Sequence, residues 1–148
     1  MYTNHEGQEQ DLQKRDVLDC LDQEQMQAMQ DQFCQTQGCY CVCVSRNMRR
    51  LTSFSGTKEE QVFIDRVFPV ATQRNLIASF SDVGGEDVIA VESGMPCVQL
   101  RGIAIRDSKG RFDGAWVLLA IDEELETEAD QVPQIMRKTT TKAFDAAV

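Results

Sequence analysis

The chain has 148 residues, of which 42% are hydrophobic and 26% are charged, which is the composition of an ordinary soluble globular domain. Its formal net charge is -9, from 24 acidic and 15 basic residues. Because nucleic acids and anionic membranes are polyanions, this charge argues against binding to either of them. The length indicates one domain, and the most apolar stretch, residues 115–121, is far shorter than a membrane-spanning helix.

The first 15 residues are polar and lack the apolar core of a signal peptide, so we expect a cytoplasmic protein with its six cysteines reduced. Three of them, Cys39, Cys41 and Cys43, alternate with an aromatic and a β-branched residue, which indicates a strand. Side chains at i and i+2 of a strand lie roughly 6.6 Å apart. Tetrahedral zinc needs its sulfurs within roughly 4 Å of one another. We therefore interpret these cysteines as buried core residues, with redox sensing and metal binding as alternatives.

Residues 1–9 are predicted to be a disordered tail, followed by a sensor domain over residues 10–125. The domain opens with a helical pattern that has Leu12, Val17, Leu18 and Leu21 on one face. We expect this apolar face to seek a partner surface, because the rest of the domain can close a core without it.

A second helix is predicted to begin after Asp22, a helix-capping residue, and to end at Gly38. Its apolar stripe consists of Met26, Met29 and Phe33, and glutamines fill the opposite face, which we interpret as solvated. A strand over residues 38–44 follows.

Residues 45–50 are predicted to form a turn, and residues 51–55 a second strand, so that the two strands make a hairpin. Helical spacing then returns over residues 58–68 and 70–80, and Pro69 separates these two helices. Three more strands are predicted at residues 87–92, 97–106 and 112–121, the last two joined by a turn at residues 107–110. The single tryptophan, Trp116, lies in the last strand and is expected to be well buried.

The C-terminal region, residues 126–148, is predicted to be a signalling helix. Leu125, Val132 and Thr139 recur every seven residues and form a weak heptad seam. The predicted dimer interface therefore combines Leu18 and Leu21 with Leu125 and Val132, and we expect a two-fold homodimer.

Strands joined by tight turns cannot be parallel neighbours. The simplest closure is thus an α+β fold with a five-stranded antiparallel sheet, helices on one face, and flanking N- and C-terminal helices.

Two stretches of the sequence resemble known sensory domains. Residues 29–38, in which a helix ends at a glycine before an apolar strand, resemble the entry of PocR-type ligand-sensing domains. Residues 101–117, an apolar hairpin that ends in Gly114-Ala-Trp-Val117, resemble the last hairpin of PAS and GAF sensor domains. The resemblance implies a PAS/GAF-like fold and a role in signal transduction, with an effector domain that is fused or separate. No PocR ligand carries over, because the cysteine-containing segments of that family lack their counterparts here.

No cofactor is expected. The only histidine, His5, lies in the predicted tail, so the domain body offers no haem ligand and no histidine-based catalytic dyad. The helical region at residues 58–80 contains no cysteine for a flavin photosensor.

For an unidentified small-molecule ligand we select Arg101, Phe63, Cys41 and Trp116. Arg101 stands out because a charge interrupts an apolar strand beside a glycine, where it could meet an acidic ligand or point to solvent. The sequence thus predicts a non-catalytic sensory domain that acts through helix-mediated dimerisation. The alternatives are a structural dimerisation module without ligand and an enzyme that uses carboxylates.

Overall fold

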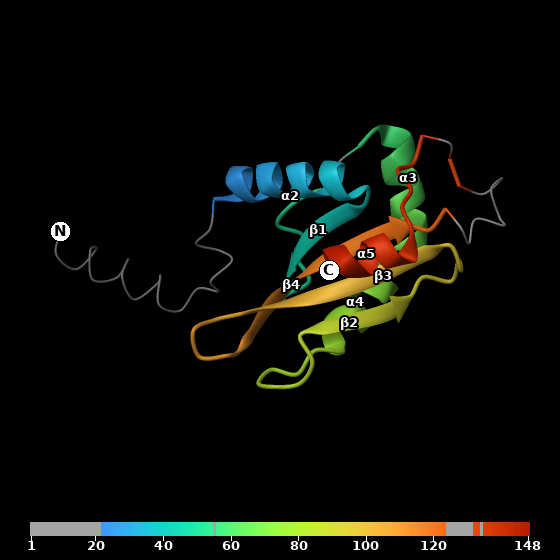
Figure 1. The fold of residues 1–148 in the computed structure, drawn as a ribbon. Coiled ribbons are helices and arrows are strands. Elements are labelled where there is room, and N and C mark those ends of the chain that lie inside the picture. The colour runs from blue at the N-terminus through green and yellow to red at the C-terminus, as the bar shows by residue number, and fades with distance from the viewer. Residues whose placement is uncertain (1–21, 55, 124–131, 134) are drawn as a thin grey trace, which may run out of the picture.

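The computed structural model describes residues 22–54, 56–123, 132–133 and 135–148. These residues form an α+β fold with a four-stranded antiparallel sheet of order β1-β4-β3-β2 (Figure 1). The strands are β1 (Tyr40–Ser45), β2 (Val88–Glu92), β3 (Val98–Arg106) and β4 (Phe112–Ile121). The described helices are α2 (Gln23–Gln37), α3 (Lys58–Val67), α4 (Val70–Ala78) and α5 (Thr141–Ala147).

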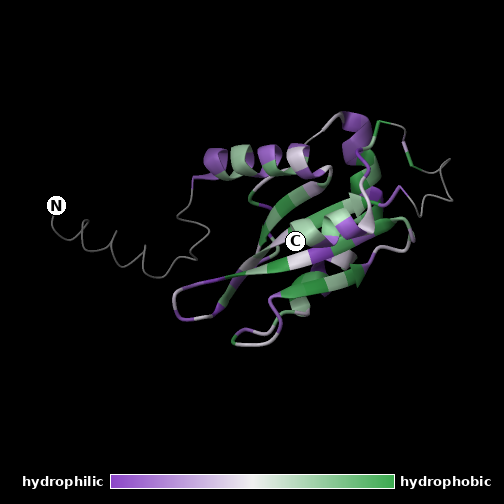
Figure 2. Ribbon diagram, viewed as in Figure 1, coloured by the Kyte–Doolittle hydropathy of each residue, from purple (hydrophilic) through white to green (hydrophobic). Residues whose placement is uncertain are grey.

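Helices cover both faces of the sheet. On one face, called here the inner face, α3 and α4 pack over side chains such as Val42, Val117 and Leu119 in the main core. On the other, the outer face, α2 and α5 pack over a smaller cluster that includes Cys41 and Leu118. The central strand β4 is buried along almost its whole length, whereas its neighbour β3 carries the polar residues Gln99 and Arg101 on the outer face; Figure 2 shows the hydropathy of the ribbon. The expectation of helices on one face was therefore wrong.

The predicted five-stranded sheet was also wrong, because residues 51–54 form no strand. Their contact with β1 consists of an isolated bridge between Val44 and Arg50 and a hydrogen bond from the Leu51 N–H to the Cys43 carbonyl. The Cys43 N–H donates instead to the Thr52 hydroxyl, at 2.8 Å. A side chain thereby interrupts the ladder that a fifth strand would need.

Glutamine side chains of α2 satisfy the backbone of this segment. The Gln27 amide accepts from the Ser53 N–H and donates to the Ser53 carbonyl, both at 2.8 Å. Gln30 also donates to the Ser53 carbonyl and accepts from the Thr52 hydroxyl. These side-chain amides take the place of a neighbouring strand. Part of the glutamine face that the sequence indicated as solvated is therefore a structural contact.

The helix boundaries agree with the sequence. The Asp22 side chain accepts hydrogen bonds from the first turn of α2, and Gly38 ends that helix in the left-handed region, with a φ of 69° that glycine adopts without steric cost. Thr57 and Glu60 form a capping box at the start of α3. Pro69 separates α3 from α4, as predicted.

A close contact between α4 and β3 explains the glycine beside Arg101. A Cβ atom at Gly102 would lie 3.0 Å from Leu76 and 3.1 Å from Phe80, both on the inner face. The glycine therefore allows α4 and its following residues to approach the sheet. It does not mark a ligand.

The described part of the C-terminal region, residues 132–133 and 135–148, contains less helix than expected. Among these residues helix is confined to α5 at Thr141–Ala147, and residues 135–140 contain a turn and a parallel bridge between Asp122 and Thr139. Asp122 also accepts hydrogen bonds from the backbone and hydroxyl of Thr141. Thr139, which was expected in the heptad seam of a helix, thus pairs with the residue that follows β4. This pairing places α5 against the outer face.

Candidate binding groove

The four predicted ligand residues do not meet in one site. Phe63 lies in the main core on the inner face, where its side chain is buried. Cys41 and Trp116 face the opposite side of the sheet. Arg101 shares that side but contacts α5. A ligand between the sheet and the helices α3 and α4 would therefore meet Phe63 alone of the four.

Cys41 and Trp116 do lie in one open apolar groove. It runs over the outer face between α2 and the end of α5, with a volume of about 320 Å³. Its lining includes Met29, Phe33, Cys41, Ile103, Trp116 and Val148. Met29 is 68% exposed, although it belongs to the apolar stripe of the predicted second helix. The groove is thus an apolar surface that the described helices leave partly uncovered.

Trp116 was expected to be well buried, and this was wrong, because its side chain is partly exposed. It pairs across the sheet with Cys43 of β1 and Ile103 of β3. Met26 packs against it from α2, but the uncovered part of the groove leaves the rest of the indole accessible. The apolar pattern of β4 continues across this uncovered position, so the pattern could not reveal the exposure.

Arg101 fastens α5 to the sheet. Its guanidinium donates to the Leu100 carbonyl and the Gln99 side chain, both at 3.0 Å. It also pairs with Asp145 of α5 at 3.4 Å and lies 5.6 Å from the centre of the Phe144 ring. With these partners the guanidinium is occupied within the chain, and the geometry favours a structural role over an anion site.

The outer face also holds a cluster of thiols beneath α2 and α5. Cys34, Cys39 and Cys41 are buried there together with Phe144, and Cys43 is buried in a neighbouring cluster. The burial of Cys39, Cys41 and Cys43 agrees with the prediction. A hydrogen bond with Cys39 lowers the pKa of Cys34, but the bond with Cys41 and burial outweigh it and raise this pKa to about 12. The hydrogen bond with Cys34, together with burial, raises the pKa of Cys39 even further. The thiols of Cys34 and Cys39 are therefore protonated and poorly nucleophilic at neutral pH.

A buried polar network joins β1 and α3 to Arg137, which lies in the segment before α5. The Tyr40 hydroxyl donates to Glu60 and accepts from the Arg137 N–H, while the Arg137 guanidinium lies 5.2 Å from the centre of the Tyr40 ring. Burial alone would raise the pKa of Glu60, but hydrogen bonds from Thr57 and Tyr40 outweigh it, and the pKa is lowered. The network holds the segment that contains Arg137 against the first turn of α3, and each of its polar groups has a hydrogen-bond partner.

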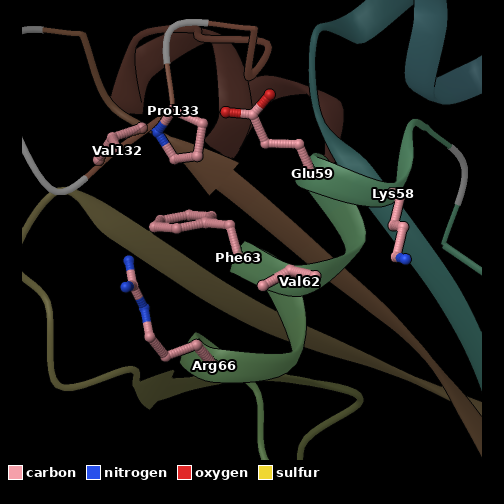
Figure 3. Close-up of a pocket in the computed structure, with 7 residues that line it drawn as sticks. All are labelled: Lys58, Glu59, Val62, Phe63, Arg66, Val132 and Pro133. Atoms are coloured by element: carbon pink, nitrogen blue, oxygen red, sulfur yellow. The ribbon is translucent and has the colours of Figure 1, made fainter.

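A second hollow lies beside α3 and is shown in Figure 3. It has a volume of about 680 Å³, and its lining joins Val62, Phe63 and Arg66 of α3 to Val132 and Pro133. The Arg66 guanidinium lies 5.2 Å from the centre of the Phe63 ring. The lining of the hollow is mixed in character, with Lys58, Glu59 and Arg66 beside the apolar side chains, and we assign it no ligand.

Of the four residues predicted at the dimer interface, the structure describes only Val132. Leu18, Leu21 and Leu125 lie outside the described residues. Val132 is buried in the main core on the inner face, with 3% of its surface exposed, so it offers little to a partner. The sequence analysis missed Met29 and Phe33 as surface residues. Their i, i+4 spacing was visible, but the same spacing is typical of a core stripe.

Within the described part of the chain, no helix is both long and apolar enough to cross a membrane. Among the same residues, no group of three or more histidine, cysteine, aspartate or glutamate side chains could hold a metal ion. The sequence matches no family model and no curated protein, and the fold matches no solved structure.

Proposed function

We propose that this chain is a cytoplasmic, non-catalytic regulatory module that acts through helix-mediated association of two copies. The observation that carries the proposal is the groove between α2 and α5, with Met29, Phe33, Ile103 and Trp116 partly exposed along it. An apolar surface of this kind on a small domain favours a protein partner, and a symmetric dimer is the commonest solution. The net charge of -9 favours a protein over a polyanionic partner.

Packing on the inner face supports association without a ligand between the sheet and its helices. Phe63, Leu76 and Phe80 are buried there, and the last two lie against Gly102. Side chains therefore fill the layer between the sheet and the helices α3 and α4. The resemblance to PAS and GAF sensory domains remains part of the proposal, as a statement about the role of the module in signalling.

A small apolar ligand in the same groove is the second candidate. The groove volume of about 320 Å³ falls at the lower end of the range for small-molecule sites, roughly 300–1,000 Å³. Two of the predicted ligand residues, Cys41 and Trp116, line it. A ligand seated there would touch both α2 and the end of α5, and it would compete with a second copy for the same surface.

Native mass spectrometry of freshly purified full-length protein tests both candidates. The proposal predicts twice the chain mass with no retained molecule. A monomer that carries an additional small mass would favour the ligand. A bare monomer at tens of micromolar, a concentration at the weak end of the affinity scale, would contradict the proposal.

A further inference from the structure

We propose that the groove of each copy receives the N-terminal apolar stripe of the other copy, an inference that rests on the proposed association of two copies. The stripe is the apolar face of the predicted first helix, Leu12, Val17, Leu18 and Leu21. The receiving site is the wall formed by Met29 and Phe33 of α2 and the floor formed by Ile103 and Trp116. The dimer would thus form by reciprocal exchange of residues 12–21.

Part of the stripe matches the groove in spacing. Met29 and Phe33 are four positions apart, a span of about 6 Å along a helix, and Val17 and Leu21 are also four positions apart. In the helix that the sequence predicts here, Val17 and Leu21 would therefore present their side chains over the same length as the exposed wall of α2. Seating them there covers Met29, Phe33, Ile103 and Trp116, the apolar side chains that the groove leaves partly exposed.

The junction at Asp22 argues against docking within one chain. The Asp22 side chain accepts from the N–H groups of Glu24 and Gln25, and its backbone is extended, so α2 begins immediately after it. To lie back along its own α2, the helix that the sequence predicts over residues 12–21 would have to reverse over Asp22 alone. Antiparallel helices need connections of 2–5 residues. The stripe of a second copy has no such constraint.

The position of the segment suits a two-fold arrangement. Residues 1–21 join the described chain at the start of α2, and α2 is itself one wall of the groove. When two copies place their α2 helices side by side, each N-terminal segment leaves next to the groove of the partner. The same contact then occurs twice, as an isologous interface requires.

Trp116 provides the measurement, because it is the only tryptophan and lies in the groove. Its fluorescence emission and its quenching by iodide would be followed in the full-length chain over a dilution series. Exchange predicts that dilution shifts the emission to longer wavelength and increases quenching, because the groove empties as the dimer dissociates. Leu18→Asp should produce the same exposed state at all concentrations. Gln8→Asp adds the same charge outside the stripe and should behave as the unmodified chain.

Sedimentation of the same samples separates the exchange from the proposed association. A dimer whose Trp116 emission does not change with dilution or with Leu18→Asp overturns the exchange and leaves the association intact. A monomer whose Trp116 is protected at all concentrations, and exposed by Leu18→Asp, shows docking within one chain and overturns the exchange. Circular dichroism checks that Leu18→Asp is folded, and Leu21→Asp repeats the test at a second position of the stripe.

Discussion

The buried thiols are expected to lower the stability of the folded protein at alkaline pH. Burial raises the pKa of Cys43 to about 12, from an ordinary value of 9.0, and Cys34 is raised to the same range with its hydrogen bonds contributing. Above pH 9 the unfolded chain releases these protons while the folded chain retains them. The stability contributed by the protonated thiols is therefore present below pH 9 and is lost as the pH rises towards 12.

We predict that the free energy of unfolding, measured by urea melts in reducing buffer, falls between pH 8 and pH 10.5. Cys43→Ala should lower the stability at pH 7 and make this alkaline decline shallower, because one thiol with a raised pKa is removed. A decline of unchanged steepness in the variant would show that the Cys43 thiol ionises alike in the folded and unfolded chains.

Trp116 and Phe63 are predicted to differ in their contribution to stability. Phe63 is 2% exposed in the main core, and Phe63→Ala should cost about 3–5 kcal/mol. Trp116→Ala should cost clearly less, because the indole is partly exposed in the groove. Urea melts of the two variants measure the loss in the free energy of unfolding. Equal losses in the two variants would show that Trp116 is buried in solution.

At the scale of elements, the segment after β1 depends on α2. Gln30→Ala removes the partner of the Thr52 hydroxyl and of the Ser53 carbonyl, at an expected cost of about 1–3 kcal/mol. Amide hydrogen exchange at Cys43, whose N–H donates to Thr52, should become faster. Gln35→Ala, at an exposed position of the same helix, should change stability by less than about 0.5 kcal/mol. Equal effects of the two substitutions would refute the proposed dependence.

The contact between α4 and β3 gives a second test at this scale. Gly102→Ala places a Cβ atom 3.0 Å from Leu76, and this overpacking should cost about 1–3 kcal/mol. Leu76→Ala opens space at the same point. The double variant should therefore lose less stability than the two single losses added together. Additive losses would mean that the two side chains do not compete for space.

The helix boundaries and the segment after β1 show what the sequence could and could not predict. Asp22, Gly38 and Pro69 act through their own backbone or short side chains, so they fixed the helix boundaries correctly. The strand expected at residues 51–55 failed because its backbone bonds go to Gln27 and Gln30, more than 20 residues away. A partner at that separation leaves no local pattern. Arg101 likewise showed its unusual position in the sequence, but its partner Asp145 became visible only through the fold.

At the scale of the whole molecule, the two faces of the sheet have different roles. The helices α2 and α5 lie over one face, where the groove between them leaves the sheet partly uncovered, and side chains of α3 and α4 fill the other face. Figure 1 shows the arrangement of these helices around the sheet. The sequence predicted apolar stripes on helices, but it could not say which stripe stays exposed. Met26 and Met29 belong to the same stripe, yet the first is 6% exposed and the second 68%. Met26 packs in a cluster with Cys43 and Leu51, whereas Met29 lines the open groove.

Sedimentation equilibrium of the full-length chain and of two matched variants tests the central claim, association through the outer face, most directly. Met29→Asp alters the groove at a position that is 68% exposed, and Val62→Asp makes the same kind of change on α3 at a position that is 62% exposed. Both substitutions leave the buried cores untouched, so both variants should fold. The account predicts a dimer for the unmodified chain and for Val62→Asp, and a monomer for Met29→Asp. A monomeric unmodified chain, or a Met29→Asp variant that is as dimeric as Val62→Asp, would contradict it.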